Sequence, residues 1–382
     1  MTALDLDIPI TFKHRIRFSK EVFSPENETL GALFDAGTEA KVIVFVENEI
    51  FNHFPKLEEE IHGWFKGAPH LSLTSITRAE GGEYCKRSET VCREVMDAIE
   101  KHKIDRHSYV WVIGGGAFLD VVGFAAATAH RGIRLVRFPT TTLSQDDSGV
   151  GVKNGINLYK KKNFLGSFAV PYAVVNDFRY LYTQPASICR EGLVESVKVA
   201  LVKDGSFFDW MVEHAEALSR LEEEVLEECV ERSAILHARH IAEGGDPFEM
   251  GSSRPLDYGH WAAHKAEQLS DFRLSHAQAV SIGVALDTLY AWKKGFLKEE
   301  QAERVIQVLK RLELPLWDEA FGIKNTDGSL ALIDGLDEFR EHLGGRLTIM
   351  LLKDLGEGFD IHEMDSAIVA ECLAILESRF GS

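Results

Sequence analysis

The chain has 382 residues, of which 45% are hydrophobic and 27% charged, as in a soluble globular protein, and this length suggests two domains. Its 60 acidic and 42 basic side chains give a net charge of −18, which disfavours general binding to nucleic acid or to an anionic membrane. No stretch approaches the roughly 20 apolar residues of a membrane span. The N-terminus lacks an apolar signal core, and the five cysteines show no CxxC spacing. We therefore expect a cytoplasmic enzyme with reduced thiols.

Strands and helices are predicted to alternate over the first 185 residues. Strands are expected at residues 41–46, 71–76, 110–113, 133–138 and 172–175, and helices at 88–102 and 117–130. Such alternation is typical of a parallel sheet covered by helices on its faces. We therefore predict an α/β N-terminal nucleotide-binding domain over residues 1–185.

Three glycines, Gly114, Gly115 and Gly116, connect a central predicted strand to the helix that follows. Glycine lets a ligand approach the backbone closely, and a helix N-terminus carries a partial positive charge. The turn therefore predicts a phosphate or pyrophosphate site, with a plain tight connection as the alternative. Its spacing, GGGxxxD, differs from the usual dinucleotide fingerprint GxGxxG.

Other polar residues follow the predicted strands of this domain. Glu47 and Asn48 follow the strand at 41–46, where a ribose hydroxyl could be met, and threonines 140–142 follow the strand at 133–138. Asp147 and Lys153 lie in the glycine-rich bend that comes next. Residues 160–162 are three lysines, which indicate either a solvated loop or an anion site.

Helical periodicity dominates from residue 187 onward. Helices are predicted at residues 189–202, 207–219, 222–242, 259–269, 277–293, 299–312 and 364–378. Only residues 347–352 resemble a strand. We therefore predict a mainly α-helical C-terminal domain over residues 186–382.

The helical half contains a candidate metal site. Glu195 and Lys198 share one face of a predicted helix, His260 and His264 are spaced i and i+4, and His276 begins a later helix. One carboxylate and two imidazoles are typical ligands of a catalytic divalent ion, most often Zn²⁺. The histidine pair alone is weak evidence, since such pairs are more often ordinary surface or core residues. The absence of HExxH excludes a zincin-type metalloprotease.

Several motifs together carry a family resemblance. GGGAFLD, GVKNGIN, KKNFLGSF, EGLVESVK, PLDYGHWAAH and LSHAQAV occur in the order seen in 3-dehydroquinate synthase and its relatives. Over about residues 40–350 the chain resembles these sugar phosphate cyclases, which include 2-epi-5-epi-valiolone synthase and 2-deoxy-scyllo-inosose synthase. The resemblance implies the dehydroquinate synthase-like fold, bound NAD, a divalent ion (Zn²⁺, with Co²⁺ as the alternative) and a homodimer.

The resemblance also implies roles for individual residues. It makes Glu195, His260 and His276 the metal ligands and His264 a phosphate or proton-relay residue. The positions that map to NAD contacts are Asn48, Glu83, Lys86, Gly115, Gly116, Asp120, Thr141, Thr142, Asp147 and Thr183. The positions that map to substrate and phosphate contacts are Lys153, Lys162, Asn163 and Lys198, of which the first two also lie beside the cofactor. Arg131 matches an arginine that reaches the active site of the neighbouring subunit.

The family chemistry explains why these residue types converge. The reaction consists of transient oxidation by NAD, β-elimination of phosphate, re-reduction and an intramolecular aldol closure, so the enzyme would be a carbon–oxygen lyase acting on phosphates. The metal binds hydroxyls of the sugar, and the lysines stabilise the departing phosphate.

Departures from the family pattern bear on the substrate. In 3-dehydroquinate synthases a lysine and an arginine hold the substrate carboxylate, whereas here His237 stands at the lysine position. The arginine position falls on Ser253, with Arg254 one residue away. Asp257 replaces an expected asparagine, as in valiolone-type cyclases, and would repel an acidic substrate. Arg340 stands where a lysine pair is expected. The chain nevertheless keeps His264, which valiolone-type enzymes lack.

We therefore predict a sugar phosphate cyclase whose substrate is a ketose phosphate without a carboxylate, such as sedoheptulose 7-phosphate. One alternative is a 3-dehydroquinate synthase acting on 3-deoxy-D-arabino-heptulosonate 7-phosphate, with His237 and Arg254 binding the carboxylate. A second is a metal-dependent glycerol or alcohol dehydrogenase, against which the lysine motifs GVK and KKN argue. A non-enzymatic homologue is the weakest alternative, because the expected metal and cofactor residues are all present.

Overall fold

The computed structural model describes residues 3–35, 37, 39–159 and 161–381, which group into two compact units. The first unit comprises Met1–Thr140 and Gly151–Arg179, and the second comprises Thr141–Val150 and Tyr180–Ser382. Residues 141–150 therefore group with the helical half, although the predicted boundary after residue 185 placed them in the first domain. An α/β unit and a mainly helical unit are present, which confirms the predicted fold class.

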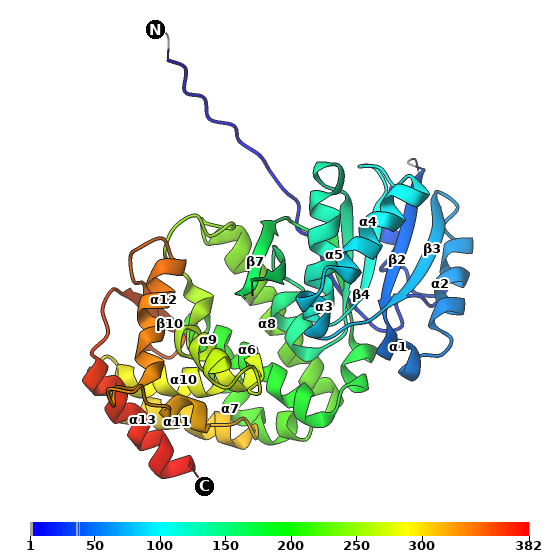
Figure 1. The fold of residues 1–382 in the computed structure, drawn as a ribbon. Helices are drawn as coiled ribbons and strands as arrows, with labels where there is room; N and C mark the ends of the chain where they lie inside the picture. The colour runs from blue at the N-terminus through cyan, green and yellow to red at the C-terminus, as the bar shows by residue number, and fades with distance from the viewer. Residues whose placement is uncertain (1–2, 36, 38, 160, 382) are drawn as a thin grey trace. The chain divides into compact units, whose positions relative to one another are not determined.

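A wholly parallel six-stranded sheet forms the centre of the first unit (Figure 1). Its strand order is β1 (Ile16–Ser19), β8 (Ala173–Asp177), β5 (Arg134–Pro139), β4 (Tyr109–Gly114), β2 (Ala40–Glu47) and β3 (Leu71–Ala79). The five predicted strands are confirmed. The edge strand β1 was not predicted, because its sequence IRFS is too short to show a pattern.

Side chains of β4 alternate between two apolar layers, as expected for a strand buried on both faces. Val110 and Val112 belong to a core shared with helices α4 (Thr90–His102) and α5 (Gly116–Thr128). Trp111 points to the opposite face, where its ring lies 5.0 Å from that of Phe65 in α2 (Leu57–Lys66). Two short helices, α1 (Asn48–His53) and α3 (Tyr84–Arg87), follow β2 and β3.

The glycine-rich bend and lysine run form an antiparallel hairpin of β6 (Lys153–Leu158) and β7 (Lys161–Phe168), which the sequence analysis did not predict. Gly155 and Gly166 pair across it, and a Cβ atom at Gly166 would lie 2.9 Å from the carbonyl oxygen of Asn154. The glycines are therefore needed for close strand approach rather than for a loop. Buried Arg137 of β5 holds the hairpin by donating to Asn154 Oδ1 at 2.6 Å.

Helices dominate the second unit. They are α6 (Ala186–Lys203), α7 (Gly205–Ser219), α8 (Glu223–Glu243), α9 (His260–Leu269), α10 (His276–Lys293), α11 (Glu299–Arg311), α12 (Asp334–His342) and α13 (Ser366–Phe380). A ribbon of β9 (Ile349–Asp354) and β10 (Glu357–Ile361) joins them. The seven predicted helices are confirmed, whereas α12 and β10 were not predicted. Among the described residues, no helix combines the length and apolar character needed to cross a membrane.

Candidate metal centre and nucleotide site

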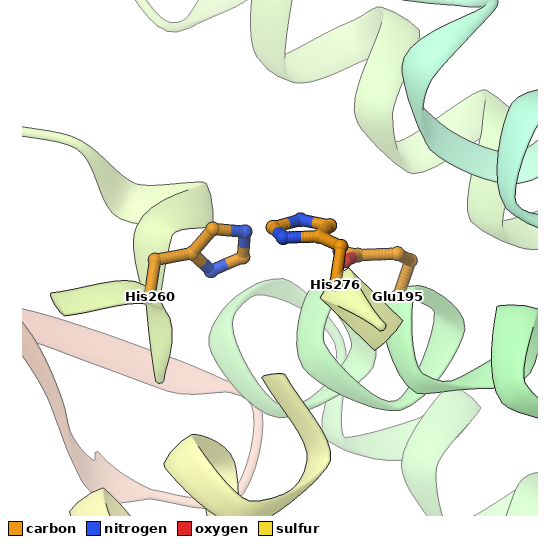
Figure 2. Close-up of side chains that lie close together, drawn as sticks. All are labelled: Glu195, His260 and His276. Atoms are coloured by element: carbon orange, nitrogen blue, oxygen red, sulfur yellow. The ribbon is translucent and has the colours of Figure 1, made fainter. Parts of the chain in front are cut away.

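Glu195, His260 and His276 come together in the second unit, from helices α6, α9 and α10 (Figure 2). One possible ligand atom from each lies within 4.8 Å of the other two. Glu195 and His260 are buried, and His276 is partly exposed. The exposed ring of His264 stacks on that of His276, with 5.8 Å between the centroids. One carboxylate and two imidazoles so arranged match the donor set of a divalent metal centre.

Both candidate ligand imidazoles are held through Nδ1. His260 Nδ1 lies 3.2 Å from the carbonyl oxygen of Tyr258, and His276 Nδ1 lies 2.6 Å from Oε1 of buried Glu267. An Nδ1–H donated to an oxygen leaves Nε2 of each ring as the nitrogen that can bind a metal. Burial, with Lys198 as the next cause, lowers the pKa of His260 well below its usual value. The neutral form that metal binding requires is therefore favoured.

Lys198 lies beside this cluster and is itself buried. Its ammonium pairs with Glu195 and lies 3.7 Å from Oδ1 of Asp147. Burial alone would lower the pKa of Lys198, but the two carboxylates outweigh it and raise the pKa above its usual value. Lys198 is therefore a fixed positive charge next to the candidate metal ligands.

Residues Ser144–Ser148 form a π-helical turn that aims two neighbouring carboxyl groups in different directions. Asp147 faces Lys198 and His237, whose Nδ1 lies 3.1 Å from Oδ1. Asp146 is buried and accepts a hydrogen bond from Ser196. Burial, with Asp147 and Glu195 adding to it, raises the pKa of Asp146 well above its usual value, which favours its neutral form.

A close approach of two glycines positions the start of α9, where His260 lies. Gly259 has φ +80°, and a Cβ atom there would lie 2.6 Å from the backbone nitrogen of Val284. A Cβ atom at Gly283 would overlap the carbonyl oxygen of Gly259. Buried Asp287 of α10 accepts from Gly259 N at 2.9 Å and from Trp261 Nε1 at 2.8 Å. These contacts fix the backbone on both sides of His260.

The start of α10 is fixed in a similar way. Ser275 and Gln278 form a capping box around the first turn, which contains His276. Glu191 of α6 accepts from Ser275 Oγ at 3.0 Å and from Gln278 Nε2 at 2.7 Å. Glu191 lies one helical turn before Glu195, so the same helix supplies one candidate ligand and positions another.

The candidate nucleotide site lies in the first unit, where β2 and β4 end next to each other. The chain passes from β2 to β3 on one side of this point and from β4 to β5 on the other side. Such a reversal of strand order is the topological switch point, where open α/β sheets bind ligands. Glu47 bridges the turns here, because its carboxylate accepts from Gly115 N at 2.8 Å and from Gly82 N at 2.9 Å. The Gly115 N–H is thus engaged by Glu47, whereas the sequence analysis expected it to face a ligand. The N-cap residue of α5, Gly115, supplies no capping side chain, so the first N–H groups of the helix itself suit an anion.

Two predicted NAD contacts, Lys86 and Asp120, pair with each other at 2.7 Å, and Lys86 is buried. Asn48 begins α1 at the carboxyl end of β2, and Glu83 precedes α3. In the second unit, Thr141 Oγ1 donates to Ser144 Oγ at 2.8 Å.

Two other predicted NAD contacts are engaged within the second unit. Thr142 is fully buried, with its hydroxyl 3.0 Å from Cys189 Sγ and 3.2 Å from Gln184 Nε2. The Thr183 hydroxyl donates to the carbonyl oxygen of Tyr180 at 2.8 Å. In this structure both hydroxyls therefore hold the local backbone and side chains in place.

The predicted phosphate contacts of the first unit lie on the hairpin. Lys153 begins β6, and Lys162 and Asn163 lie in β7, all three with exposed side chains. Lys160 falls outside the described residues. Exposed Arg131 lies in a 3-10 turn (Ala129–Arg131) at the far end of α5, with φ +63°, so α5 ends at Thr128 rather than at the predicted residue 130.

The side chains at the two positions predicted for carboxylate binding, His237 and Arg254, are already engaged with acidic groups. His237 contacts Asp147, as described above. Arg254 places Nε 3.1 Å from Glu249 Oε2, and its terminal nitrogens donate to the carbonyl oxygens of Glu249, Gly251 and Ser253. Asp257 is partly buried and adds to the negative potential at Lys198. Arg340 is exposed and pairs with Asp337 of its own helix.

Sequence reasoning missed three supporting residues, Glu191, Glu267 and Asp287, and it expected Glu47 beside a ribose rather than as the acceptor from Gly115 and Gly82. Each of these carboxylates accepts a hydrogen bond from a glycine N–H, a capping residue or a candidate metal ligand. Most of the partners lie on elements that are far apart in the sequence. Glu267 offered one signal, since it lies seven residues after His260 and so shares its helix face. Glu191 and Asp287 had no comparable pattern.

Comparison with known proteins identifies the family. Residues 76–191 match the family model of the 3-dehydroquinate synthase N-terminal domain, and residues 192–333 match that of its C-terminal domain. A 3-dehydroquinate synthase of Halorhodospira halophila is 33% identical over 290 residues, covering 76% of this chain and 79% of the relative. A 3-dehydroquinate synthase of Nitratiruptor sp. is 35% identical over 298 residues, covering 76% of this chain and 79% of that relative.

Solved structures of sugar phosphate cyclases also match this chain. The structure of a 2-epi-5-epi-valiolone synthase from Streptomyces hygroscopicus with NAD⁺ and Zn²⁺ bound has a TM-score of 0.85 at 26% identity, covering 98% of this chain and 100% of that one. A 2-deoxy-scyllo-inosose synthase complexed with carbaglucose-6-phosphate, NAD⁺ and Co²⁺ has a TM-score of 0.73 at 20% identity, with shares of 94% and 95%, and shows the shared fold. On the matched domains, the curated relatives and the common fold, this chain belongs to the 3-dehydroquinate synthase family of sugar phosphate cyclases.

Proposed function

We propose that this chain is an NAD- and divalent-metal-dependent sugar phosphate cyclase whose substrate lacks a carboxylate, with sedoheptulose 7-phosphate as the first candidate. The main support for this substrate class is that the side chains at the predicted carboxylate-binding positions already contact acidic residues. His237 contacts Asp147, Arg254 contacts Glu249, and the nearby Asp257 is itself acidic. A substrate carboxylate would have to displace these acids and would be repelled by them.

The residues of the second unit fit a resident divalent ion, for which we propose Zn²⁺, with Co²⁺ as the alternative. Glu195, His260 and His276 supply one oxygen and two nitrogens within 4.8 Å of one another, and both imidazoles are held by Nδ1. Three protein ligands leave a position for substrate oxygens. When bound, the ion supplies Lewis acidity that polarises those oxygens.

The carboxyl edge of the sheet fits a dinucleotide. The first N–H groups of α5, which follow the N-cap residue Gly115, suit the pyrophosphate, and Asn48 lies at the end of β2, where a ribose would be met. We propose that Asp120, Glu83 and Lys86 border the same cofactor. When bound, NAD supplies a hydride acceptor that is regenerated within one turnover, so that no net NADH is formed.

Positive groups of this chain would handle the phosphate. The Lys198 ammonium is permanently charged and would stabilise negative charge on a substrate oxygen beside Glu195. His264 lies at the exposed side of the histidine cluster, where it would donate a hydrogen bond or a proton to the leaving phosphate. Lys153, Lys162 and Asn163 lie exposed on the hairpin of the first unit, where they would bind a phosphate.

Arg131 is proposed to act on a neighbouring subunit. It lies at the opposite end of α5 from the glycine turn, and a helix of 13 residues spans about 20 Å. That distance exceeds the reach of an arginine side chain, so Arg131 cannot contact a pyrophosphate at the glycine turn of its own chain. A homodimer would bring it to a second active site.

The decisive experiment measures release of inorganic phosphate from two substrates in the presence of NAD and Zn²⁺. We expect turnover of sedoheptulose 7-phosphate and at least a hundredfold lower kcat/KM with 3-deoxy-D-arabino-heptulosonate 7-phosphate. Preference for the carboxylated substrate would establish the second candidate, 3-dehydroquinate synthase, which the curated relatives at 33–35% identity favour. Net NADH formation without phosphate release would instead establish a dehydrogenase and overturn the proposal.

The metal assignment has a separate test. His276→Ala should lose bound metal, measured by elemental analysis after dialysis, and should lose turnover with it. His214→Ala, a partly buried histidine of α7 outside the cluster, is the matched control and should stay metal-replete. A metal-replete, active His276→Ala protein would refute the ligand assignment.

A further inference from the structure

The N-terminal arm, residues 3–13, has the pattern of an amphipathic strand without a sheet. Leu4, Leu6, Ile8, Ile10 and Phe12 alternate with residues that are mostly polar, and these five side chains are 55–81% exposed. The arm runs as an extended segment away from the sheet of its own unit (Figure 1). Period-2 alternation is the pattern of a strand that buries one face. Five exposed apolar residues in a row of this kind indicate a surface that is covered in the assembled protein.

The hairpin offers an open strand edge next to positive charge. Within the described residues, β7 pairs only with β6, so its other edge is open. Phe164 and Phe168 are 49% and 44% exposed. The arm carries Asp5 and Asp7, whereas β7 begins with two lysines. An open apolar edge strand next to positive charge is a template for an apolar strand with acidic residues.

Sheet alternation shows which side chains of the hairpin face away from α5. Asn154 and Ile156 of β6 turn toward α5, since Asn154 Oδ1 would meet a Cβ atom at Gly123 and Ile156 belongs to the core that contains α5. Gly166 and Phe168 pair with Gly155 and Lys153, the alternate positions of β6. Phe168, with Phe164 four residues before it, therefore lies on the face turned away from α5.

The arm and the hairpin end at the same edge of the sheet as Arg131. The arm leads into β1 and β7 leads within a few residues into β8, and both strands begin at the amino edge of the parallel sheet. The turn that holds Arg131 leads into β5 at this edge as well. The edge from which Arg131 is proposed to reach a neighbouring subunit is thus the edge from which the arm departs.

We propose that the arm crosses to a second copy of this chain and adds as a strand along the open edge of its β7. The row of Leu4, Leu6, Ile8 and Ile10 would then cover Phe164 and Phe168 of the partner, and Asp5 and Asp7 would lie near its hairpin lysines. Because the exchange is reciprocal, each copy gives one arm and receives another, as a closed two-fold dimer requires. The contact does not depend on the proposed catalytic function.

A complementation experiment tests this exchange. One variant lacks residues 2–13 but keeps the hairpin, and the other keeps the arm but carries Phe164→Ser and Phe168→Ser. Amide hydrogen exchange is measured on the arm peptide of the second variant, alone and after co-expression with the first. Only the second variant has an arm, so the signal reports a single chain. We expect fast exchange alone and at least tenfold slower exchange in the co-expressed dimer.

Three results would overturn the proposal. They are an arm that exchanges at unstructured rates in the dimeric wild-type protein, an arm still protected in the Phe164→Ser and Phe168→Ser variant alone, and no recovery of protection on co-expression. The second result would mean that the arm binds elsewhere. As a matched pair, Ile8→Asp should abolish arm protection in the wild-type background, whereas Thr11→Asp on the polar row should preserve it.

Discussion

Nδ1 of His276 lies 2.6 Å from the carboxylate oxygen Oε1 of buried Glu267, which lies two residues before the end of α9. The two residues are nine apart in the chain, and the loop between α9 and α10 brings them together. A carboxylate that accepts from a ligand histidine fixes the ring orientation and makes the other nitrogen a stronger donor. Glu267 therefore has a positioning role in the candidate metal centre.

Replacing Glu267 by Gln is expected to weaken Zn²⁺ binding by roughly 10–100-fold, because the amide cannot supply the same negative charge to His276. Competition with a chromophoric chelator measures the affinity without any need for turnover. Glu213→Gln, at an exposed position of α7, is the matched control and should bind Zn²⁺ like the wild type. Equal affinities of the Glu267→Gln variant and the wild type would show that Glu267 only packs against the histidine.

Asp257→Asn should shift substrate preference toward a carboxylated sugar phosphate, because it removes a negative charge beside Lys198. We expect the ratio of kcat/KM for 3-deoxy-D-arabino-heptulosonate 7-phosphate to that for sedoheptulose 7-phosphate to rise by about tenfold, or about 1.4 kcal/mol. Asp271→Asn, in the exposed turn after α9, makes the same chemical change away from the site. An unchanged ratio in the Asp257 variant would contradict the repulsion argument.

Gly283→Ala is expected to destabilise the second unit by about 1–3 kcal/mol, because the added methyl group overlaps the carbonyl oxygen of Gly259 and pushes α9 from α10. Loss of Zn²⁺ affinity should accompany the loss of stability, since His260 follows Gly259. Urea unfolding followed by tryptophan fluorescence measures the first effect. Gly63→Ala, in α2 with open space around it, should be neutral or slightly stabilising. A Gly283→Ala protein as stable as wild type would show that the helices can separate without cost.

Lys86→Ala should destabilise the first unit by about 3 kcal/mol, because it leaves Asp120 without the cation that it contacts at 2.7 Å in a largely buried position. The matched control is Arg93→Ala, which breaks an exposed pair with Glu89 on α4 and should leave the unfolding midpoint unchanged. If Lys86 serves only the cofactor, Lys86→Ala would instead weaken NAD binding, measured by calorimetry, and leave the stability of the NAD-free protein at the wild-type value.

The sequence by itself determined the strands and helices that carry strong periodicity. The apolar runs of β2, β4 and β5 and the long helices α6 to α11 were predictable because burial on one or two faces requires a repeating pattern. The composition of the candidate metal centre was also predictable, since Glu195, His260 and His276 are the residue types that divalent ions select. The family motifs assigned their roles.

Only the tertiary structure decided how these residues are held and which neighbours they have. The contacts of Glu47 with Gly115, of Asp287 with Gly259 and of His237 with Asp147 join residues between 28 and 90 positions apart. No local pattern encodes such pairs, because they depend on which helix faces and strand ends become neighbours after folding. The hairpin shows the same limit, since glycines that suggest a flexible bend in a linear reading are those that two closely packed strands require.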